Sequence, residues 1–373
     1  MELGLSPEQT AFRDEVRAWL REHVTPLGSP GTAEGFAAHR EWERKLSAAG
    51  YGAVTDVVLR SIFEEEYLLA GGPERVTVLG QKLMAPTLMA HGTDEQKKRW
   101  LPGIVSAEEI WSQGFSEPGA GSDLAGIRTR AELVGDEYVI NGQKIWTSYG
   151  AFADWIFLLV RTDPSAERHR GITFIAADMR TDGIEARPIT QLDGHAGFAE
   201  VFLTDARVPA ANVVGDVNDG WRVAMTTLGA EREAPARPAA RYIRDIRELA
   251  TMTDDKDALA ALYVEAKCYE HASRRVLSRL AAGEEIGVEA SVTKLQWSEL
   301  ERRVFEIGLD LTGTDHTDAW WTKYWYARAA TIYAGTSEIQ RNIIAERILG
   351  LPREAARAPS TAGGSGGAAP PIL

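Results

Sequence analysis

The chain has 373 residues, of which 44% are hydrophobic and 25% charged, a composition typical of a folded globular protein rather than a disordered or fibrous one. Its 54 acidic residues outnumber its 41 basic residues and give a net charge of −13, which argues against nucleic acid or an anionic membrane surface as the main partner. The single cysteine, Cys268, excludes an intramolecular disulfide, and the seven histidines are scattered without ligand spacing, so no metal site is predicted.

The chain begins MELGLSPEQ, without the basic and apolar regions of a signal peptide. No apolar run approaches the roughly 18 residues needed to span a bilayer. From these two features we expect a cytoplasmic protein with no membrane partner.

Two capping boxes predict helix starts in the first part of the chain, Ser6-Pro7-Glu8-Gln9 and Thr93-Asp94-Glu95-Gln96. The first has proline at the first helical position, and the second opens a helix predicted to run to Pro102. Apolar residues at helical spacing lie between them, over residues 42–49 and 62–70. We therefore predict an α-helical N-terminal domain over residues 1–106.

A loop of small residues follows Trp111, with SEPGAGSD at its centre. Its backbone N–H groups can surround a phosphate or pyrophosphate, because few β-carbons stand in the way. Leu124 stands where a G-x-G-x-x-G motif needs its last glycine and no Walker-type GK[ST] follows, so a Rossmann fold is not predicted. An ordinary glycine-rich surface loop is the alternative. The small residues are Gly114, Gly119, Ala120, Gly121 and Ser122.

The next stretch alternates as a strand hairpin, with Leu133, Tyr138 and Ile140 around the turn residues Gly135 and Asp136. The stretch ends on one large aromatic side chain beside two hydroxyl groups. This combination would fit a flat heterocycle with polar edges. An ordinary strand pair is the alternative. The three residues at this end are Trp146, Thr147 and Ser148.

Apolar alternation with a period of two predicts a middle β domain over residues 107–210, and it continues over residues 155–161, 171–177 and 201–203. From Gly220 onward, helical spacing predicts an α-helical C-terminal domain over residues 211–352, with segments at 259–280, 292–311 and 329–349. The tail, residues 353–373, is predicted to be disordered, because PSTAGGSGGAAPP cannot bury enough surface to offset its ordering entropy. No function is assigned to it.

SEPGAGSD followed by INGQKIWTS resembles the flavin-binding middle domain of the acyl-CoA dehydrogenase family, and IYAGTSEIQRNIIAERILGLPR resembles that family's closing helix. The resemblance spans roughly residues 1–353. It implies the α+β acyl-CoA dehydrogenase fold, with an N-terminal helical domain, a middle β-barrel or sandwich and a C-terminal four-helix bundle. It also implies FAD as cofactor, an acyl-CoA thioester as substrate and an electron-transfer flavoprotein as electron acceptor.

The implied reaction is an α,β-dehydrogenation to the trans-2-enoyl-CoA, in which a carboxylate removes the α-proton and the β-hydrogen leaves as hydride to the flavin. Four residues match positions that contact the isoalloxazine, namely Phe115, Ser116, Trp146 and Ser148. Gly121 and Ser122 belong to the loop near the pyrophosphate, and Thr336 matches a contact to a flavin phosphate.

The resemblance also assigns substrate contacts. Ser122 matches a position near the CoA moiety, and the backbone N–H of Ala334 matches the donor that holds the thioester carbonyl. Arg232 matches an arginine near the acyl-CoA, with an ordinary surface cation as the alternative.

The family's usual base is a glutamate immediately before the C-terminal Gly-Thr, and here that position is Ala334, which cannot accept a proton. A branch of the family that includes isovaleryl-CoA dehydrogenase carries its base in an L-x-x-E-R pattern, and Leu228-Gly229-Ala230-Glu231-Arg232 fits it. We therefore expect Glu231 to be the base, with a solvated surface glutamate as the alternative. Glu233 competes but lies about 200° away around a helix. Pro235 and Pro238 leave open which face reaches the site.

Homotetrameric relatives complete each neighbour's flavin site with an R-x-x-F-G stretch and a Q-x-x-G-G turn. The first has no counterpart between Tyr242 and Asp257, and the second reads Leu309-Asp310-Leu311-Thr312-Gly313, without the glutamine. A paralogous partner would supply both elements in an α2β2 assembly, which resembles actinobacterial subunits that act on steroid side-chain thioesters. A homotetramer that holds its flavin with other groups is the alternative.

A non-catalytic structural subunit is the second hypothesis for the function, because the usual base and the neighbour motifs are missing. A related flavoprotein with another use, such as an oxidase, a nitroalkane-oxidising enzyme or a nucleic-acid-associated relative, is the third. The family's longer connection after Val54 is also absent, which is either a trimmed surface loop or an opening for a bulkier acyl group. We expect a bulky or branched acyl group.

Overall fold

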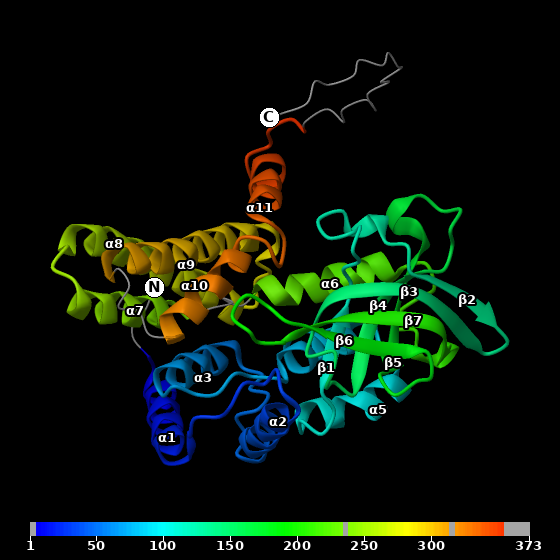
Figure 1. The fold of residues 1–373 in the computed structure, drawn as a ribbon, viewed down its shortest axis with the longest axis horizontal. Helices are drawn as coiled ribbons and strands as arrows, with labels where there is room; N and C mark the ends of the chain where they lie inside the picture. The colour runs from blue at the N-terminus through cyan, green and yellow to red at the C-terminus, as the bar shows by residue number, and fades with distance from the viewer. Residues whose placement is uncertain (1–4, 234–237, 313–317, 354–373) are drawn as a thin grey trace, which may run out of the picture.

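The computed structural model describes residues 5–233, 238–312 and 318–353. N-terminal helices, a curled β-sheet and a bundle of C-terminal helices lie beside one another (Figure 1), which confirms the predicted α+β organisation. The predicted tail lies outside the described residues beyond Arg353. No helix in the described part of the chain is both long and apolar enough to cross a membrane.

The N-terminal part contains five α-helices from residue 5 onward, where the described residues begin, and both predicted capping boxes are confirmed. The side chain of Ser6 accepts from the Gln9 N–H at 3.2 Å, and that of Thr93 accepts from the Gln96 N–H at 3.2 Å. The helices are α1 (Pro7–His23), α2 (Ala33–Ala48), α3 (Val57–Leu69), α4 (Ala85–His91) and α5 (Asp94–Val105), with a π-helical turn over Leu79–Met84 before α4.

Two features of these helices differ from the sequence predictions. The helix predicted to end at Pro102 continues to Val105, because a proline so close to a helix end removes one hydrogen bond without breaking a long ladder. The turn at Leu79–Met84 and α4 were not predicted. The short connection after Tyr51 leads directly into the cap of α3, where the Asp56 carboxylate accepts the N–H groups of Val58 and Leu59, both at 2.9 Å.

In the described residues seven strands form one sheet, in which β4 pairs with three others, β1, β2 and β5. The hairpin around Gly135 and Asp136 is confirmed, since Val134 pairs with Glu137 and Gly135 has a φ of +67°. The strands are β1 (Trp111–Gly114), β2 (Arg130–Val134), β3 (Glu137–Ser148), β4 (Trp155–Arg161), β5 (Ile172–Asp178), β6 (Ile184–Ile189) and β7 (Phe198–Pro209). Strand β6 was not predicted, because its charged residues and Pro188 mark a half-exposed edge.

The largest core lies between the sheet and helices α4, α5 and α6. Trp111 of β1 stacks on Trp155 of β4 at 5.4 Å between ring centroids, and Trp100 of α5 meets both rings edge-on. Helix α6 (Gly220–Glu233) adds Val223 and Ala224 to this core. The sheet therefore fixes the position of α6, the helix that carries Glu231.

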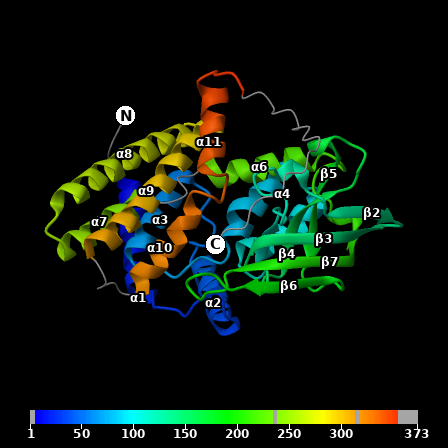
Figure 2. The same cartoon turned by 45° about the horizontal axis from the view of Figure 1, so that its top comes forward.

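The C-terminal helices α7 to α10 pack around a second core in a four-helix arrangement, as the resemblance implied. The segment predicted as helical over residues 329–349 is instead broken between α10 and α11, because Ala334 and Gly335 both have positive φ. Helix α11 stands away from the bundle in both views (Figures 1 and 2) and packs on α9. The helices are α7 (Ala239–Met252), α8 (Lys256–Ala281), α9 (Ala290–Thr312), α10 (Asp318–Ala330) and α11 (Ser337–Ile343).

Gly220, the first residue of α6, touches the backbone of β5. A β-carbon there would lie 2.4 Å from both the Phe174 nitrogen and the Thr173 carbonyl carbon. We expect Gly220→Ala to lower the free energy of unfolding by about 1–3 kcal/mol, because neither backbone can move without disturbing the sheet. Thermal or denaturant unfolding measures the change.

The matched control for this substitution is Gly229→Ala in the same helix, where a β-carbon would meet nothing within 4 Å. Alanine there should leave stability unchanged or raise it by up to about 1 kcal/mol, the propensity difference between the two residues. Equal effects of the two substitutions would contradict close packing of α6 on β5.

Candidate functional site

The loop that begins with Phe115 and Ser116 follows β1 and lies beside the end of β3. The Ile145 N–H donates to the Ser116 carbonyl at 3.0 Å, and the Ser112 hydroxyl donates to the Ser148 carbonyl at 2.8 Å. The structure thus brings Phe115 and Ser116 next to the segment that carries Trp146 and Ser148.

The ring of Phe115 is part of the core. It meets Phe157 and Phe174 edge-on, at 5.6 Å and 6.0 Å between centroids, and is 5% exposed. Any ligand above this loop therefore meets the main chain of Phe115 and not its ring.

A buried ion pair that the sequence analysis missed supports the same loop. The Lys144 ammonium donates to the Glu117 carboxylate at 2.8 Å, to the Leu159 carbonyl at 2.7 Å and to the Phe115 carbonyl at 3.2 Å. Glu117 also accepts the backbone N–H groups of Arg128 at 2.6 Å and Thr129 at 2.9 Å. One lysine thus ties the start of the loop to β4, and one glutamate ties it to the start of β2.

Burial lowers the pKa of the Lys144 ammonium to about 8, and the attraction of Glu117 limits the fall. Burial alone would raise the pKa of Glu117, but Lys144 and the N–H donors outweigh it and hold that pKa below its ordinary value. Both groups are therefore mainly charged at neutral pH. The alternating pattern of β3 could have predicted that Lys144 is buried, since Lys144 points to the same side of the strand as the buried Tyr138 and Ile140.

Trp146 lies at a β-bulge in β3, where the register with β7 shifts between Lys144 and Thr147. Its φ is +60°, a left-handed conformation that is costly for a bulky residue. The indole is 57% exposed and meets only the edge of Phe198, at 6.2 Å, among the ring contacts of the described residues. The bulge thus presents one large aromatic plane to a ligand or a partner chain.

Three predicted serines have unused hydroxyls, and two of them, Ser116 and Ser148, lie beside the segment of Trp146. Within the described part of the chain, the side chains of Ser116, Ser122 and Ser148 make no hydrogen bond, although Ser116 and Ser148 are half-buried. Gly119 and Gly121 border open space, because a β-carbon at either would meet nothing within 4 Å. Unused hydroxyls, open backbone and an exposed indole fit a flavin with its phosphate-bearing tail.

The predicted substrate and phosphate contacts Ala334 and Thr336 lie in the turn between α10 and α11. Ala334 has a φ of +53° and Gly335 of +89°, and the Gln340 amide donates to their carbonyls at 3.0 Å and 3.3 Å. Thr336 caps α11 by accepting the Ile339 N–H at 3.2 Å. The Ala334 N–H has no acceptor among the described residues, so it is available to a ligand.

This turn is not joined to the β1 and β3 site by any hydrogen bond between described residues. The bonds of Ala334, Gly335 and Thr336 stay within the turn and α11, while Ser337 and Arg341 bind Glu299 of α9 at 2.9 Å and 3.0 Å. The predicted site residues thus form two groups, one in the sheet and one before α11.

Glu231 and Arg232 belong to the last turn of α6, and their side chains lie outside the described residues. The helix before them is anchored on α4. The hydroxyls of Thr227 and Thr87 are hydrogen-bonded at 2.8 Å inside the core, and His91 bonds Thr226 at 2.8 Å. In the stretch that corresponds to Q-x-x-G-G, Leu309 lies in α9 and Gly313 lies outside the described residues.

Three protein-family models together match most of the chain. The model described as acyl-CoA dehydrogenase, N-terminal domain, matches residues 6–108, the middle-domain model matches residues 112–206 and the C-terminal-domain model matches residues 218–349. The matches follow the order of the helical, sheet and helical parts of the structure.

Among curated proteins, the chain is 40% identical to acyl-CoA dehydrogenase IpdE1 of Mycobacterium tuberculosis, over 92% of this chain and 98% of that protein. It is 41% identical to IpdE1 of Mycolicibacterium smegmatis, over 93% and 99%. Among solved structures, the Tcur3481-Tcur3483 steroid ACAD matches with a TM-score of 0.83 and 28% identity, over 95% of this chain and 100% of that one. The ChsE4-ChsE5 complex from Mycobacterium tuberculosis matches with 0.80 and 30%, over the same shares.

Proposed function

The chain belongs to the acyl-CoA dehydrogenase family, and from this premise we propose that it is a subunit of an FAD-dependent enzyme that converts an acyl-CoA thioester to the trans-2-enoyl-CoA. The family consists of flavoproteins that oxidise a CH–CH bond of acyl-CoA. The observation that carries the proposal is the exposed, strained Trp146 beside the hydroxyls of Ser116 and Ser148, which have no partners in the described chain.

Two residues of β3 and two of the loop after β1 would hold the isoalloxazine. The Trp146 indole would cover it, the hydroxyls of Ser116 and Ser148 would bond its polar edge, and the main chain of Phe115 would border it. Ser122, Gly121 and Thr336 would bind the phosphates, with Thr336 at the start of α11. When bound, FAD supplies the acceptor for the β-hydrogen as hydride.

The chain's own residues would prepare the substrate for proton loss. The free N–H of Ala334 would donate to the thioester carbonyl, which stabilises the negative charge that develops there as the α-proton leaves. Glu231, one helical turn beyond Thr227 in α6, would accept that proton. Arg232 and Ser122 would bind the CoA portion as its anionic groups approach.

We propose a paralogous partner in an α2β2 assembly. Two similar solved structures are named as pairs of proteins, Tcur3481-Tcur3483 and ChsE4-ChsE5. In this chain, apolar residues near α11 are exposed, Ile332 at 63% and Leu349 at 64%. Leu309 stands where homotetrameric relatives have the glutamine, so the partner would supply that contact and the arginine to the flavin held here.

The name steroid ACAD of one similar structure supports a bulky acyl group, such as a steroid side chain, as the substrate. The short connection after Tyr51 is compatible with such a group. We expect an electron-transfer flavoprotein to reoxidise the flavin.

A non-catalytic structural subunit is the second candidate function, because Ala334 replaces the usual base and Leu309 the usual glutamine. The unused hydroxyls and the strained Trp146 argue against it. A structural subunit would have no need to keep these features open to a ligand.

Co-expression with a paralogous partner, compared with expression alone, tests the proposal. We expect the chain alone to carry little flavin and the complex to have an α2β2 mass with one FAD per pair. Anaerobic addition of acyl-CoA thioesters should bleach the flavin absorbance of the complex, most rapidly with bulky or steroid acyl groups.

Two outcomes would overturn parts of this proposal. A flavin-loaded homotetramer formed by the chain alone would exclude the need for a partner. A complex that binds no flavin, or whose flavin no thioester bleaches, would favour the structural subunit. Hydrogen peroxide formation without an added acceptor would instead indicate an oxidase.

A further inference from the structure

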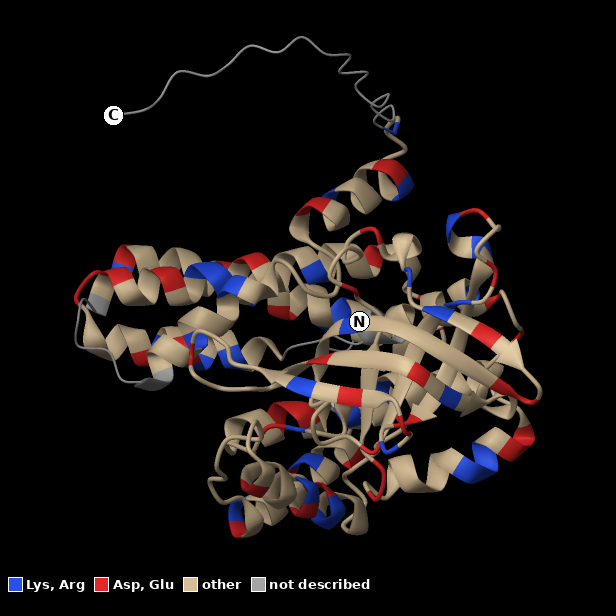
Figure 3. Cartoon of the chain, turned by 45° about the vertical axis from the view of Figure 1, so that its right-hand side comes forward, with Lys and Arg blue, Asp and Glu red and all other residues tan. Residues whose placement is uncertain are grey.

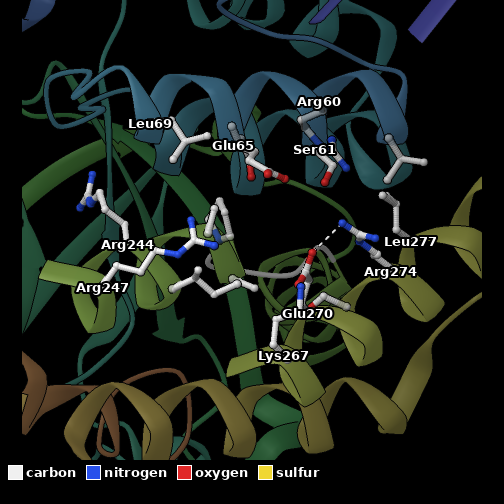
Figure 4. Close-up of a pocket in the computed structure, with 17 residues that line it drawn as sticks. Arg60, Ser61, Glu65, Leu69, Arg244, Arg247, Lys267, Glu270, Arg274 and Leu277 are labelled. Atoms are coloured by element: carbon white, nitrogen blue, oxygen red, sulfur yellow. Dashed lines mark hydrogen bonds and ion pairs between the residues drawn. The ribbon is translucent and has the colours of Figure 1, made fainter. Parts of the chain in front are cut away.

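A cleft of about 400 Å³ lies between α3, α7 and α8 (Figure 4). None of the residues expected to contact flavin or thioester lines it. Basic and acidic residues are interspersed along the helices and strands of the acidic chain (Figure 3). In this cleft, by contrast, basic side chains outnumber acidic ones.

Five basic side chains line the cleft against three acidic ones, Glu64, Glu65 and Glu270. Glu64 pairs with Lys82, outside the cleft, at 2.5 Å. Glu270 is shared by Lys267 and Arg274. The remaining basic side chains are Arg60, Arg244 and Arg247.

These three guanidinium groups lack full partners. The side chains of Arg60 of α3 and Arg247 of α7 make no ion pair or hydrogen bond with any other described residue. Arg244 donates to the Leu68 carbonyl at 3.1 Å, and its contact to Asp245 is long, 3.4 Å, because that carboxylate also binds Lys323 at 3.1 Å. The cleft therefore has unused donors that prefer planar oxyanions.

Glu65 repels a bound anion less than an ordinary glutamate would. Burial and the neighbouring Glu270 carboxylate raise the pKa of Glu65, so it is neutral over a wider pH range. It has no ion-pair partner in the described part of the chain.

The walls between the charged groups are apolar. Val57 and Leu69 of α3, Ile243 of α7 and Leu277 of α8 line the cleft, and a cleft of this size suits a small molecule. An inorganic ion would leave these walls exposed to water. A ligand with an apolar body and one anionic end would use both parts.

We infer that the cleft between α3, α7 and α8 binds the carboxylate end of an amphipathic small molecule, with Arg247 as its main ligand; Arg60 lies toward the other end of the cleft (Figure 4). The apolar body of that molecule lies between Val57, Leu69, Ile243 and Leu277. This site does not depend on the proposed dehydrogenation, and its test has a binding readout only.

Calorimetric titration of the full chain with decanoate tests the inference, with decanamide as the uncharged probe. We expect decanoate to bind and decanamide to bind at least tenfold more weakly, since decanamide lacks the charge. The substitution Arg247→Met should weaken decanoate binding at least tenfold. It should not harm folding, because the Arg247 side chain has no partner among the described residues.

Arg275→Met is the matched control, since Arg275 is an exposed arginine of α8 that does not line the cleft. It should leave decanoate binding unchanged. Inorganic phosphate that competes with decanoate would show that the site accepts any oxyanion and would support the inference. Equal binding of decanoate and decanamide, equal binding by the Arg247 variant and the control, or no binding of decanoate would overturn it.

Discussion

Glu231→Gln is expected to slow the bleaching of the flavin by acyl-CoA about 10²- to 10⁴-fold, the contribution of a positioned general base. Glutamine keeps the size of the side chain but cannot take the α-proton. Ala334 offers no side chain to replace it. Substrate affinity and flavin content should change little, because the carboxylate acts on the proton rather than on the cofactor. Anaerobic stopped-flow absorbance of the assembled complex measures the rate.

Glu233→Gln in the same complex is the control. The two positions lie about 200° apart around α6, so only one of them can face the thioester. A large loss in the Glu233 variant, with normal bleaching in the Glu231 variant, would reassign the base. Normal bleaching in both would move the base to the partner subunit.

Local signals in the sequence predicted the elements that hold the site. The capping boxes at Ser6 and Thr93 and the turn at Gly135 and Asp136 act within a few residues, so their hydrogen bonds could be read directly. The period of two in β3 placed Trp146 near Ser148 at a strand end. It did not predict the bulge that exposes the indole, because the bulge depends on the pairing with β7.

Contacts between segments that are distant in the sequence could not be predicted from local sequence patterns. Lys144 and Glu117 lie 27 residues apart, and only the folded sheet brings them to 2.8 Å. Phe115 was assigned to the flavin from the resemblance, whereas its ring packs against β4 and β5, which no local pattern indicates. The charged cleft joins α3 to α7 and α8 across the middle of the sequence, so composition along the chain did not indicate it either.

Lys144→Met is expected to lower the free energy of unfolding by about 3–5 kcal/mol, the usual cost of removing one partner of a buried ion pair. Methionine fills most of the space but leaves the Glu117 carboxylate buried without its cation. Three hydrogen bonds that fix the loop after β1 disappear with the ammonium. We therefore also expect the complex to retain much less FAD. Thermal unfolding and flavin content of the purified complex measure the two effects.

The double substitution Lys144→Met with Glu117→Gln separates lost charge balance from lost positioning. Glutamine removes the uncompensated charge, so stability should recover in part relative to Lys144→Met alone. Flavin retention should not recover, since no ammonium then holds the Phe115 and Leu159 carbonyls. Full recovery of both would mean that Lys144 only balances Glu117. A Lys144→Met complex of normal stability and flavin content would contradict the assigned role of the pair.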